Sequence, residues 1–250
     1  MASIHAHVRH QLLKVRSFVR KIFGYRIRWL ATLLYKGSPS GLPGLDQKLL
    51  EEIDTSPGYY IEIGANDGVS QSNTLALELF YGWEGLLIEP SNATFERLKK
   101  NRSKRRNYLL KSACVSSAFP DSTVELIYAN LLSVALGLDS DVPDPHAHAE
   151  SGAKFLSSDD PIRIESVPAI TLTRALDIAR APRQVGLLSL DVEGAELEVL
   201  KGIDFEQYRF DWMLIESRNI KRLAAFLDNH GYALQKKLSH HDYLFSQQRH

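Results

Sequence analysis

The sequence predicts an α/β fold with a mostly parallel sheet and a C-terminal antiparallel hairpin. The first observation is an apolar run over residues 59–63 that is cut short by Gly64 and followed, after a polar turn, by a helical segment over residues 73–80. This order of strand, glycine turn and helix opens a nucleotide-type α/β unit. The second observation is a set of later apolar runs that each end on an acid, at residues 83–89, 186–191 and 210–216. Strands buried on both faces of a parallel sheet have this pattern.

The remaining segments fit the same fold in chain order. Helical patterns cover residues 45–53, 92–100, 172–179, 196–200 and 219–230, and a third strand is predicted over residues 108–113. Two short strands around a polar turn, residues 232–237 and 243–246, predict the closing hairpin. A dehydrogenase would more often continue with another parallel strand, so the hairpin argues against an NAD-dependent oxidoreductase.

The composition is that of a globular protein with one α/β domain: 250 residues, 44% hydrophobic and 24% charged. The single cysteine, Cys114, excludes an internal disulfide, and its apolar neighbours predict a small buried residue rather than a nucleophile. The zero net charge hides an asymmetry, because residues 1–36 hold eight Lys and Arg and no acid. The rest of the chain is acidic, so we expect no nucleic-acid partner.

Residues 1–44 are predicted to form a separate N-terminal unit, a basic amphipathic helix over residues 8–34 and a breaker-rich linker over 37–44, ahead of a domain over 45–250. Such a helix either lies on an anionic membrane surface or packs on the domain or on a second subunit, and a mitochondrial presequence has the same character. Charges interrupt every apolar stretch, which argues against a membrane span and a signal peptide. We therefore expect a cytoplasmic protein, with any membrane contact made peripherally by residues 8–34.

The glycine turn and a nearby acid predict a nucleoside site. Gly64 and Gly68 allow a sharp turn and a close approach of the backbone to a ligand. The third glycine of the dinucleotide fingerprint G-x-G-x-x-G is missing. Glu89 ends the second strand, where a carboxylate can accept two hydrogen bonds from ribose hydroxyls. An NAD-binding chain would use the same carboxylate, so Glu89 alone does not specify which nucleoside binds.

Three stretches resemble the FkbM-type S-adenosylmethionine-dependent methyltransferases. They are residues 61–74 (IEIGANDGVSQSNT), 82–90 (GWEGLLIEP) and 190–196 (LDVEGAE). The resemblance extends over most of the chain after the N-terminal unit. It implies a class I methyltransferase (Rossmann-like) fold, S-adenosyl-L-methionine as cofactor, and methyl transfer to an oxygen. It also implies a small-molecule or glycan acceptor, with the methyl group going to a hydroxyl of a sugar, glycan or secondary metabolite.

The resemblance also implies which residues contact the cofactor. Glu62 would hold the glycine turn or the methionyl amine, Glu89 would hold the ribose, and Ser112 and Ala113 would lie near the adenine. The expected cofactor-binding residues are Glu62, Gly64, Ala65, Asn66, Asp67, Gly68, Asn73, Glu89, Pro90, Ser112, Ala113 and Asp191.

Catalysis is expected from acids at strand ends. Methyl transfer to a hydroxyl requires alignment of the acceptor and removal of its proton. Asp191 and Glu193 are placed to face the acceptor, one of them as the base, although the ordinary pKa of a carboxylate is low for this task. A raised pKa, a histidine or a metal would then be required. Asp191 and Glu216 could bind Mg²⁺, but we favour the interpretation in which Glu216 caps its strand and bonds backbone amides.

Residues 121–168 interrupt the alternation of strands and helices. Segments 123–128 and 162–167 have β-strand character and predict an extra hairpin arm, and the polar, proline-broken stretch between them predicts an irregular lid over the site. This stretch contains His146 and His148, which are either metal ligands, a base or, as is more usual on a loop, solvated side chains. The basic run 99–106 is expected to be a solvated helix end.

One alternative function belongs to a different class. The chain could be a non-catalytic methyltransferase-like scaffold that acts at a membrane surface through residues 8–34. The presence of Gly64, Asn66, Asp67 and Glu89 favours the enzyme, because a scaffold that had lost its ligand could tolerate broken cofactor motifs.

Overall fold

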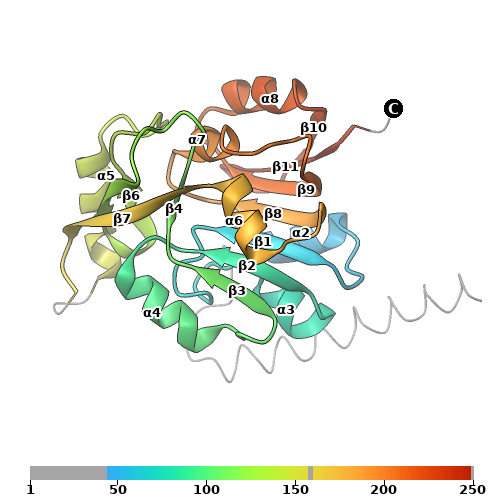
Figure 1. Ribbon diagram of the computed structural model, residues 1–250, viewed down its shortest axis with the longest axis horizontal. Helices are drawn as coiled ribbons and strands as arrows, with labels where there is room; N and C mark the ends of the chain where they lie inside the picture. The colour runs from blue at the N-terminus through green and yellow to red at the C-terminus, as the bar shows by residue number, and fades with distance from the viewer. Residues whose placement is uncertain (1–43, 157–159, 249–250) are drawn as a thin grey trace, which may run out of the picture.

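The computed structural model describes residues 44–156 and 160–248, so the basic segment 8–34 lies outside the described residues. A seven-stranded sheet lies between two layers of helices, and a smaller sheet packs at its side (Figure 1). The strands of the large sheet are β1 (Tyr59–Ile63), β2 (Glu84–Ile88), β3 (Asn107–Leu110), β8 (Gln184–Leu190), β9 (Arg209–Glu216), β10 (Tyr232–Lys237) and β11 (Asp242–Gln247).

The order of these strands is β10-β11-β9-β8-β1-β2-β3. All pairs from β3 to β9 are parallel, whereas β11 runs antiparallel to both β9 and β10. This confirms the predicted mostly parallel sheet with a C-terminal antiparallel hairpin. The chain leaves β1 towards β2 on one side, while β8 lies on the other, so a topological switch point lies at β1. Ligand sites of open α/β sheets lie at such points, beyond the carboxyl ends of the strands.

Helices cover both faces of the large sheet, which explains why its strands are apolar along their length. Residues of α6 (Leu172–Ala179), α7 (Glu196–Leu200) and α8 (Ile220–Asp228) enter one core cluster. Residues of α2 (Leu45–Glu52), α3 (Leu75–Tyr81) and α4 (Asn92–Asn101) enter the cluster on the opposite face. The central strand β1 lies between the two clusters, and four of its five residues are buried. No helix within residues 44–156 and 160–248 is long and apolar enough to cross a bilayer.

The predicted third strand is divided between the two sheets. β3 ends at Leu110, and the chain then forms β4 (Ala113–Val115), which pairs with β7 (Arg163–Thr171) of the small sheet. The expectation of one strand over residues 108–113 is therefore wrong at its end. The turn between β3 and β4 carries the chain from one sheet to the other, with Ser112 in the turn and Ala113 as the first residue of β4.

The insertion at residues 121–168 is a folded unit. Its β5 (Thr123–Tyr128) pairs antiparallel with β7 and with the short β6 (Val134–Ala135), giving the order β4-β7-β5-β6. The predicted hairpin arm is thus confirmed. The 3-10 turn η1 (Asn130–Leu132) connects β5 to β6, and η2 (Gly152–Phe155) follows the helix α5 (Pro145–Ser151). In Figure 1 this unit lies beside the carboxyl-terminal ends of β1 and β8.

The predicted irregular lid contains a helix, α5, where the sequence expectation was a broken loop. Asp144 is its N-cap and accepts a hydrogen bond from the Ala147 amide (3.0 Å). Pro145 occupies the first turn, where its missing N–H group has no intrahelical partner to lose. Ala149 packs in a small apolar cluster with Ile127 and Val134. Pro145 marks the start of a helix, whereas the prediction of an irregular loop treated it as a helix-breaking residue.

Candidate functional site

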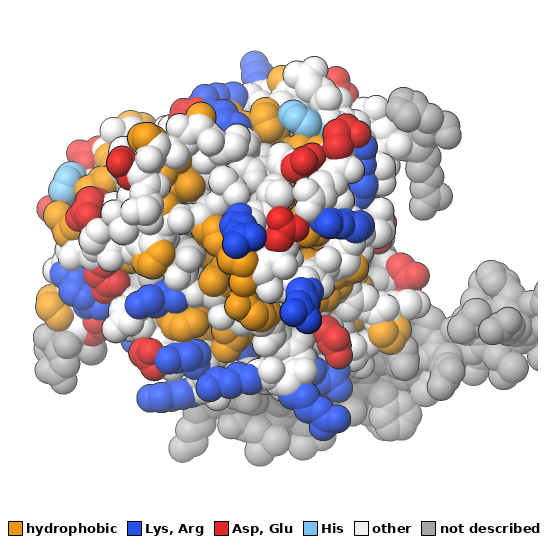
Figure 2. Space-filling model, in the orientation of Figure 1, with side chains coloured by type: hydrophobic (Ala, Val, Ile, Leu, Met, Phe, Trp, Pro, Cys, Tyr) orange, Lys and Arg blue, Asp and Glu red, His pale blue; other side chains and the backbone are white. Residues whose placement is uncertain are grey.

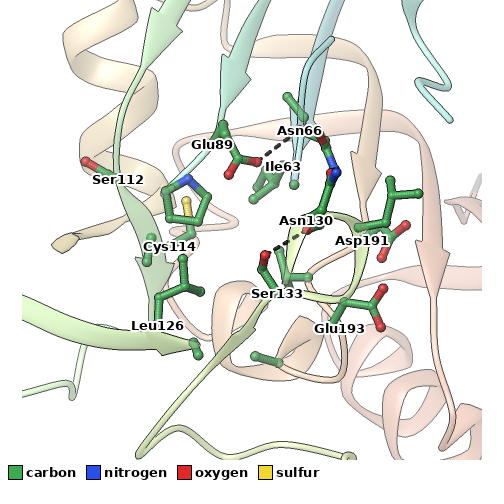
Figure 3. A pocket seen from close by; sticks show the side chains of 18 of the residues that line it. Ile63, Asn66, Glu89, Ser112, Cys114, Leu126, Asn130, Ser133, Asp191 and Glu193 are labelled. Atoms are coloured by element: carbon green, nitrogen blue, oxygen red, sulfur yellow. Dashed lines mark hydrogen bonds between the residues drawn. The ribbon is translucent and has the colours of Figure 1, made fainter. Parts of the chain in front are cut away.

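A pocket lies at the carboxyl ends of β1, β2 and β8, between the large sheet and the insertion. Figure 3 shows its walls: Glu89 and Asn66 at the sheet edge, Cys114 and Leu126 on one side, and Asp191 and Glu193 on the other.

The glycine turn brings β1 against β8 at the base of the cavity. Gly64 has φ +81°, and a Cβ at this position would lie 1.8 Å from the backbone oxygen of Asp191. A side chain here would therefore have to separate the two strands. The Asp191 amide donates to the Ile63 carbonyl at 3.1 Å, which fixes the start of the loop that carries the acids.

Glu62, the acid inside β1, supports the turn from within the domain. Its Oε1 accepts from the backbone N of Asn73 (2.8 Å), and its Oε2 accepts from Ser72 Oγ (2.9 Å) and Thr74 Oγ1 (2.7 Å). Arg102 Nη1 approaches the same Oε2 at 3.3 Å. Because protein donors occupy both oxygens, Glu62 holds the chain after the glycine turn. It is not among the described residues that line the cavity.

Arg102 is the buried centre of this support, and its side chain is 0% exposed. Its Nε donates to Glu78 Oε2 (2.6 Å), its Nη1 to the carbonyl of Gly68 (3.1 Å), and its Nη2 to the hydroxyl of Tyr60 (2.7 Å). Two buried carboxylates, those of Glu62 and Glu78, compensate its charge.

The expectation that the whole basic run 99–106 is solvated is therefore wrong at Arg102. The other Lys and Arg residues of the run remain at least partly accessible to solvent. In Figure 2, Lys and Arg side chains gather along the lower edge of the molecule, where Figure 1 places α4. An arginine inside a basic run resembles its neighbours in the sequence. The available signal was the pair of acids at core positions, Glu62 and Glu78, which needed a cation.

Glu89 directly follows β2, is buried, and lines the cavity. Its Oε2 accepts from the Asn66 amide (2.9 Å), and its Oε1 accepts from the Ser91 amide (2.9 Å) and from Thr94 Oγ1 (2.6 Å). Burial raises its pKa even though these three donors favour the ionised form. A carboxylate has about four acceptor positions. About one acceptor position therefore remains for a ligand hydroxyl, whereas the sequence predicted that Glu89 would accept two hydrogen bonds from the ribose.

The insertion supplies the wall opposite the glycine turn. Asn66 Nδ2 donates to Asn130 Oδ1 at 3.2 Å, and both residues have positive φ, 47° and 57°. Non-glycine residues rarely adopt this conformation, and those that do gather at functional sites. In Figure 3 the Asn66–Asn130 pair lies between Glu89 and the carboxylates of Asp191 and Glu193. The cavity thus has two parts, one beside Glu89 and one beside the paired acids.

Three acids meet in the second part. One carboxylate oxygen from each of Asp191, Glu193 and Glu216 lies within 4.8 Å of the others. Burial, together with the charge of Glu216 and a hydrogen bond to it, raises the pKa of Asp191 well above its usual range. Carboxylates this close together cannot all ionise easily, so the cluster favours retention of a proton. Burial and the charge of Glu216 raise the pKa of Glu193 to about 8.

This arrangement changes the interpretation of Glu216. Its carboxylate faces Asp191, and no backbone amide of the described residues bonds it. The three carboxylates could together hold Mg²⁺, which keeps metal binding at Asp191 and Glu216 as the alternative that the sequence did not favour.

The loop that carries these acids is fixed from both sides. Glu196 Oε1 accepts from the amides of Val192 and Gly194, each at 3.0 Å. On the outer side, the Asp141 amide of the insertion donates to the Gly194 carbonyl at 2.8 Å. Glu196, in the first turn of α7, thus holds the loop in shape.

His148 connects the insertion to the acids. Its Nε2 lies 2.9 Å from Glu193 Oε2, and Arg218 Nη2 donates to the same oxygen at 3.1 Å. Burial, and then the charge of Arg218, lower the pKa of His148, so its ring is neutral at neutral pH. His146 is exposed on the same helix and is not among the described residues that line the cavity. Of the two histidines, only His148 meets the site.

The residues expected to bind the cofactor fall into two groups. Those that line the cavity are Gly64, Ala65, Asn66, Glu89, Pro90, Ser112, Ala113 and Asp191, and the catalytic candidate Glu193 lines it as well. Those outside the lining are Glu62, Asp67, Gly68 and Asn73. The outer group shapes the turn: for example, Asp67 Oδ1 accepts from the amides of Val69 and Ser70.

Sequence reasoning missed the lining residues that follow the turn and those that come from the insertion. They are Ser70, Gln71, Ser72, Leu126, Asn130, Leu131, Ser133, Ala135 and Leu138. Cys114 also lines the cavity, and burial raises the pKa of its thiol to about 12, which agrees with the expectation that it is not a nucleophile.

Several solved structures resemble the chain at low sequence identity. Methyltransferase FkbM from Methylobacillus flagellatus KT is 14% identical, with a TM-score of 0.44; the match covers 79% of this chain and 45% of that chain. A precorrin-6y C5,15-methyltransferase from Geobacter metallireducens is 11% identical, with a TM-score of 0.40 and coverage of 82% and 86%. A SAM dependent methyltransferase from Aquifex aeolicus is 11% identical, with a TM-score of 0.40 and coverage of 81% and 88%.

Comparison with curated proteins gives no significant match. The sequence pattern of the Methyltransferase FkbM domain, in contrast, matches residues 62–234, which is more than half of the chain and includes the glycine turn, the insertion and the acidic loop. The chain therefore belongs to the FkbM methyltransferase family.

Proposed function

We propose that this protein is an S-adenosylmethionine-dependent O-methyltransferase whose acceptor is a hydroxyl of a sugar, a glycan or a secondary metabolite. The observation that carries the proposal is the division of one cavity into a part beside Glu89 and a part beside Asp191 and Glu193. The first part suits a nucleoside and the second suits an acceptor that must lose a proton. Membership of a methyltransferase family supports the same reaction class.

The residues of the first part fit the cofactor. Glu89 retains about one acceptor position for a ribose hydroxyl, and the bare backbone at Gly64 permits close approach. Ala113, Cys114 and Leu126 offer a small apolar surface of the kind on which an adenine ring packs. When bound, the cofactor would supply an activated methyl group for transfer to the acceptor.

Glu193 is the better base of the two catalytic candidates. Asp191 faces the charge of Glu216, and burial raises its pKa well above the usual range. Glu193 has a pKa raised to about 8, close to the range in which a base both ionises and accepts a proton effectively. The acceptor oxygen forms the new bond to the methyl carbon, and its proton passes to Glu193. The cationic Arg218, 3.1 Å from Glu193 Oε2, limits the negative charge of the cluster.

The test is methyl transfer with purified protein, S-adenosylmethionine and a panel of sugars, oligosaccharides and polyhydroxylated metabolites. Release of S-adenosylhomocysteine and a mass increase of one methyl group identify the acceptor. Glu193→Gln should lower turnover about 10²–10⁴-fold while S-adenosylhomocysteine still binds. Glu206→Gln, at a glutamate whose side chain is 91% exposed, is the matched control and should turn over like the wild type.

The outcomes separate the parts of the proposal. Full activity in Glu193→Gln would remove this residue from the role of base. A folded protein that binds the cofactor product but methylates nitrogen or sulfur acceptors alone would overturn the O-methyl assignment. A folded protein that binds neither cofactor nor product would favour the alternative scaffold function, which assigns the working role to residues 8–34.

A further inference from the structure

We infer that His148, supplied by the insertion, is a positioning residue for methyl transfer: its Nε2–H group holds the Glu193 carboxylate in the ionised, acceptor-facing orientation. The inference rests on the proposed function, because it assigns a partner to the proposed base. It gives the insertion a direct part in the chemistry, beyond forming a wall of the cavity.

Two side-chain nitrogens lie within hydrogen-bond distance of one oxygen of Glu193. His148 Nε2 at 2.9 Å and Arg218 Nη2 at 3.1 Å both meet Oε2. The side chains of His148 and Glu193 are only 13% and 11% exposed, so little water competes for this contact. With Oε2 engaged in this way, Oε1 is the oxygen left for a hydroxyl in the cavity that Glu193 lines.

The backbone also holds the Glu193 carboxylate in this orientation. Glu193 has φ +55°, an uncommon conformation for a residue with a Cβ. Its neighbour Gly194 is held by Glu196 from one side and by Asp141 from the other. His148 is placed by α5, whose start is capped by Asp144. Both partners of the contact are therefore set by ordered elements, as a catalytic group requires.

The charges around the pair favour a neutral His148 ring, whose tautomer then sets the direction of the hydrogen bond. Burial and Arg218 disfavour a protonated His148 ring, so His148 is a neutral imidazole that can donate from Nε2. The groups that face the pair are Arg218 and the acids Asp191, Glu196 and Glu216. Since the acids disfavour a further negative charge, Glu193 needs both donors to be an ionised base.

The kinetic test compares His148→Ala and His148→Gln with the wild type across pH. Glutamine can present an amide N–H near the position of Nε2, so it keeps the donor. We expect His148→Ala to lower kcat about tenfold to a hundredfold, to leave the acceptor KM within about threefold, and to move the acidic limb of the pH–rate profile to higher pH. His148→Gln should recover most of kcat and the wild-type limb. The control His146→Gln, at an exposed position two residues away, should match the wild type.

An acidic limb that stays in place in His148→Ala, or equal losses in the alanine and glutamine variants, would overturn the inference. A second measurement does not depend on turnover. In ¹⁵N spectra of the histidine rings, the signal lost in His148→Gln should report the Nε2–H tautomer at pH 8. An Nδ1–H tautomer would refute the donor role even if the enzyme is active. Absence of turnover in the wild type would instead count against the proposed function.

Discussion

Replacement of Arg102 by methionine should destabilise the whole domain, because one buried guanidinium compensates two buried carboxylates. Methionine retains much of the apolar stem but removes donors to Glu78, Glu62, Gly68 and Tyr60. Breaking a buried ion pair by removing one partner costs about 3–5 kcal/mol, since the remaining charge stays buried without its counter-charge. We expect a loss of this size in the free energy of unfolding.

Urea unfolding monitored by tryptophan fluorescence measures this free energy. Arg105→Met is the matched control: Arg105 belongs to the same basic run but is exposed, and its replacement should change stability by less than about 0.5 kcal/mol. Arg102→Lys keeps the charge but not the planar fork, so it should fall between the two. A loss below about 1 kcal/mol in Arg102→Met would refute the view that this residue holds the turn-supporting acids together.

Three further predictions concern the site. Gly64→Ala should abolish S-adenosylhomocysteine binding, because the new Cβ would lie 1.8 Å from a backbone oxygen. Gly231→Ala, at a similar φ of +80° but in open space, should lose only about 1 kcal/mol of stability. Equal effects of the two substitutions on stability and on binding would contradict the clash at Gly64. Folding raises the pKa of Glu193 from 4.5 to about 8, so between these pH values the folded protein binds more protons than the unfolded chain. The free energy of unfolding should therefore fall as pH rises from about 4.5 to 8, by up to about 1.4 kcal/mol per pH unit. Glu193→Gln should flatten this pH dependence, and a free energy of unfolding that rises with pH would contradict the prediction. Chelation with EDTA should change turnover less than about twofold, because His148 and Arg218 already engage Glu193. A large loss restored by Mg²⁺ would show that the three acids bind metal.

The large sheet could be predicted from the sequence because its signals are local. An apolar run that ends at Gly64, and further runs that end at Glu89, Asp191 and Glu216, specify strand ends without any knowledge of the neighbours. Parallel strands bring those ends to one edge, which is why the cavity contains Glu89 and Asp191.

The insertion side of the site could not be predicted, because it depends on tertiary pairing. Asn130 and Ser133 reach the cavity only because β5 pairs with both β6 and β7. The burial of Arg102 likewise follows from acids on other elements, and a basic run gives no indication of which of its members turns inward. Pro145 has opposite meanings at a helix start and in a loop, and Asp144 before it was the clue to the first.

The central claim is that the cavity at the switch point binds the methyl donor through the Glu89 side. Calorimetric titration with S-adenosylhomocysteine tests it most directly, with Glu89→Ala and the exposed control Glu206→Ala alongside and with unfolding curves to confirm that each variant is folded. We expect micromolar binding by the wild type and by Glu206→Ala, and loss of binding in Glu89→Ala. Unchanged binding in a folded Glu89→Ala, or no binding by the folded wild type, would contradict it.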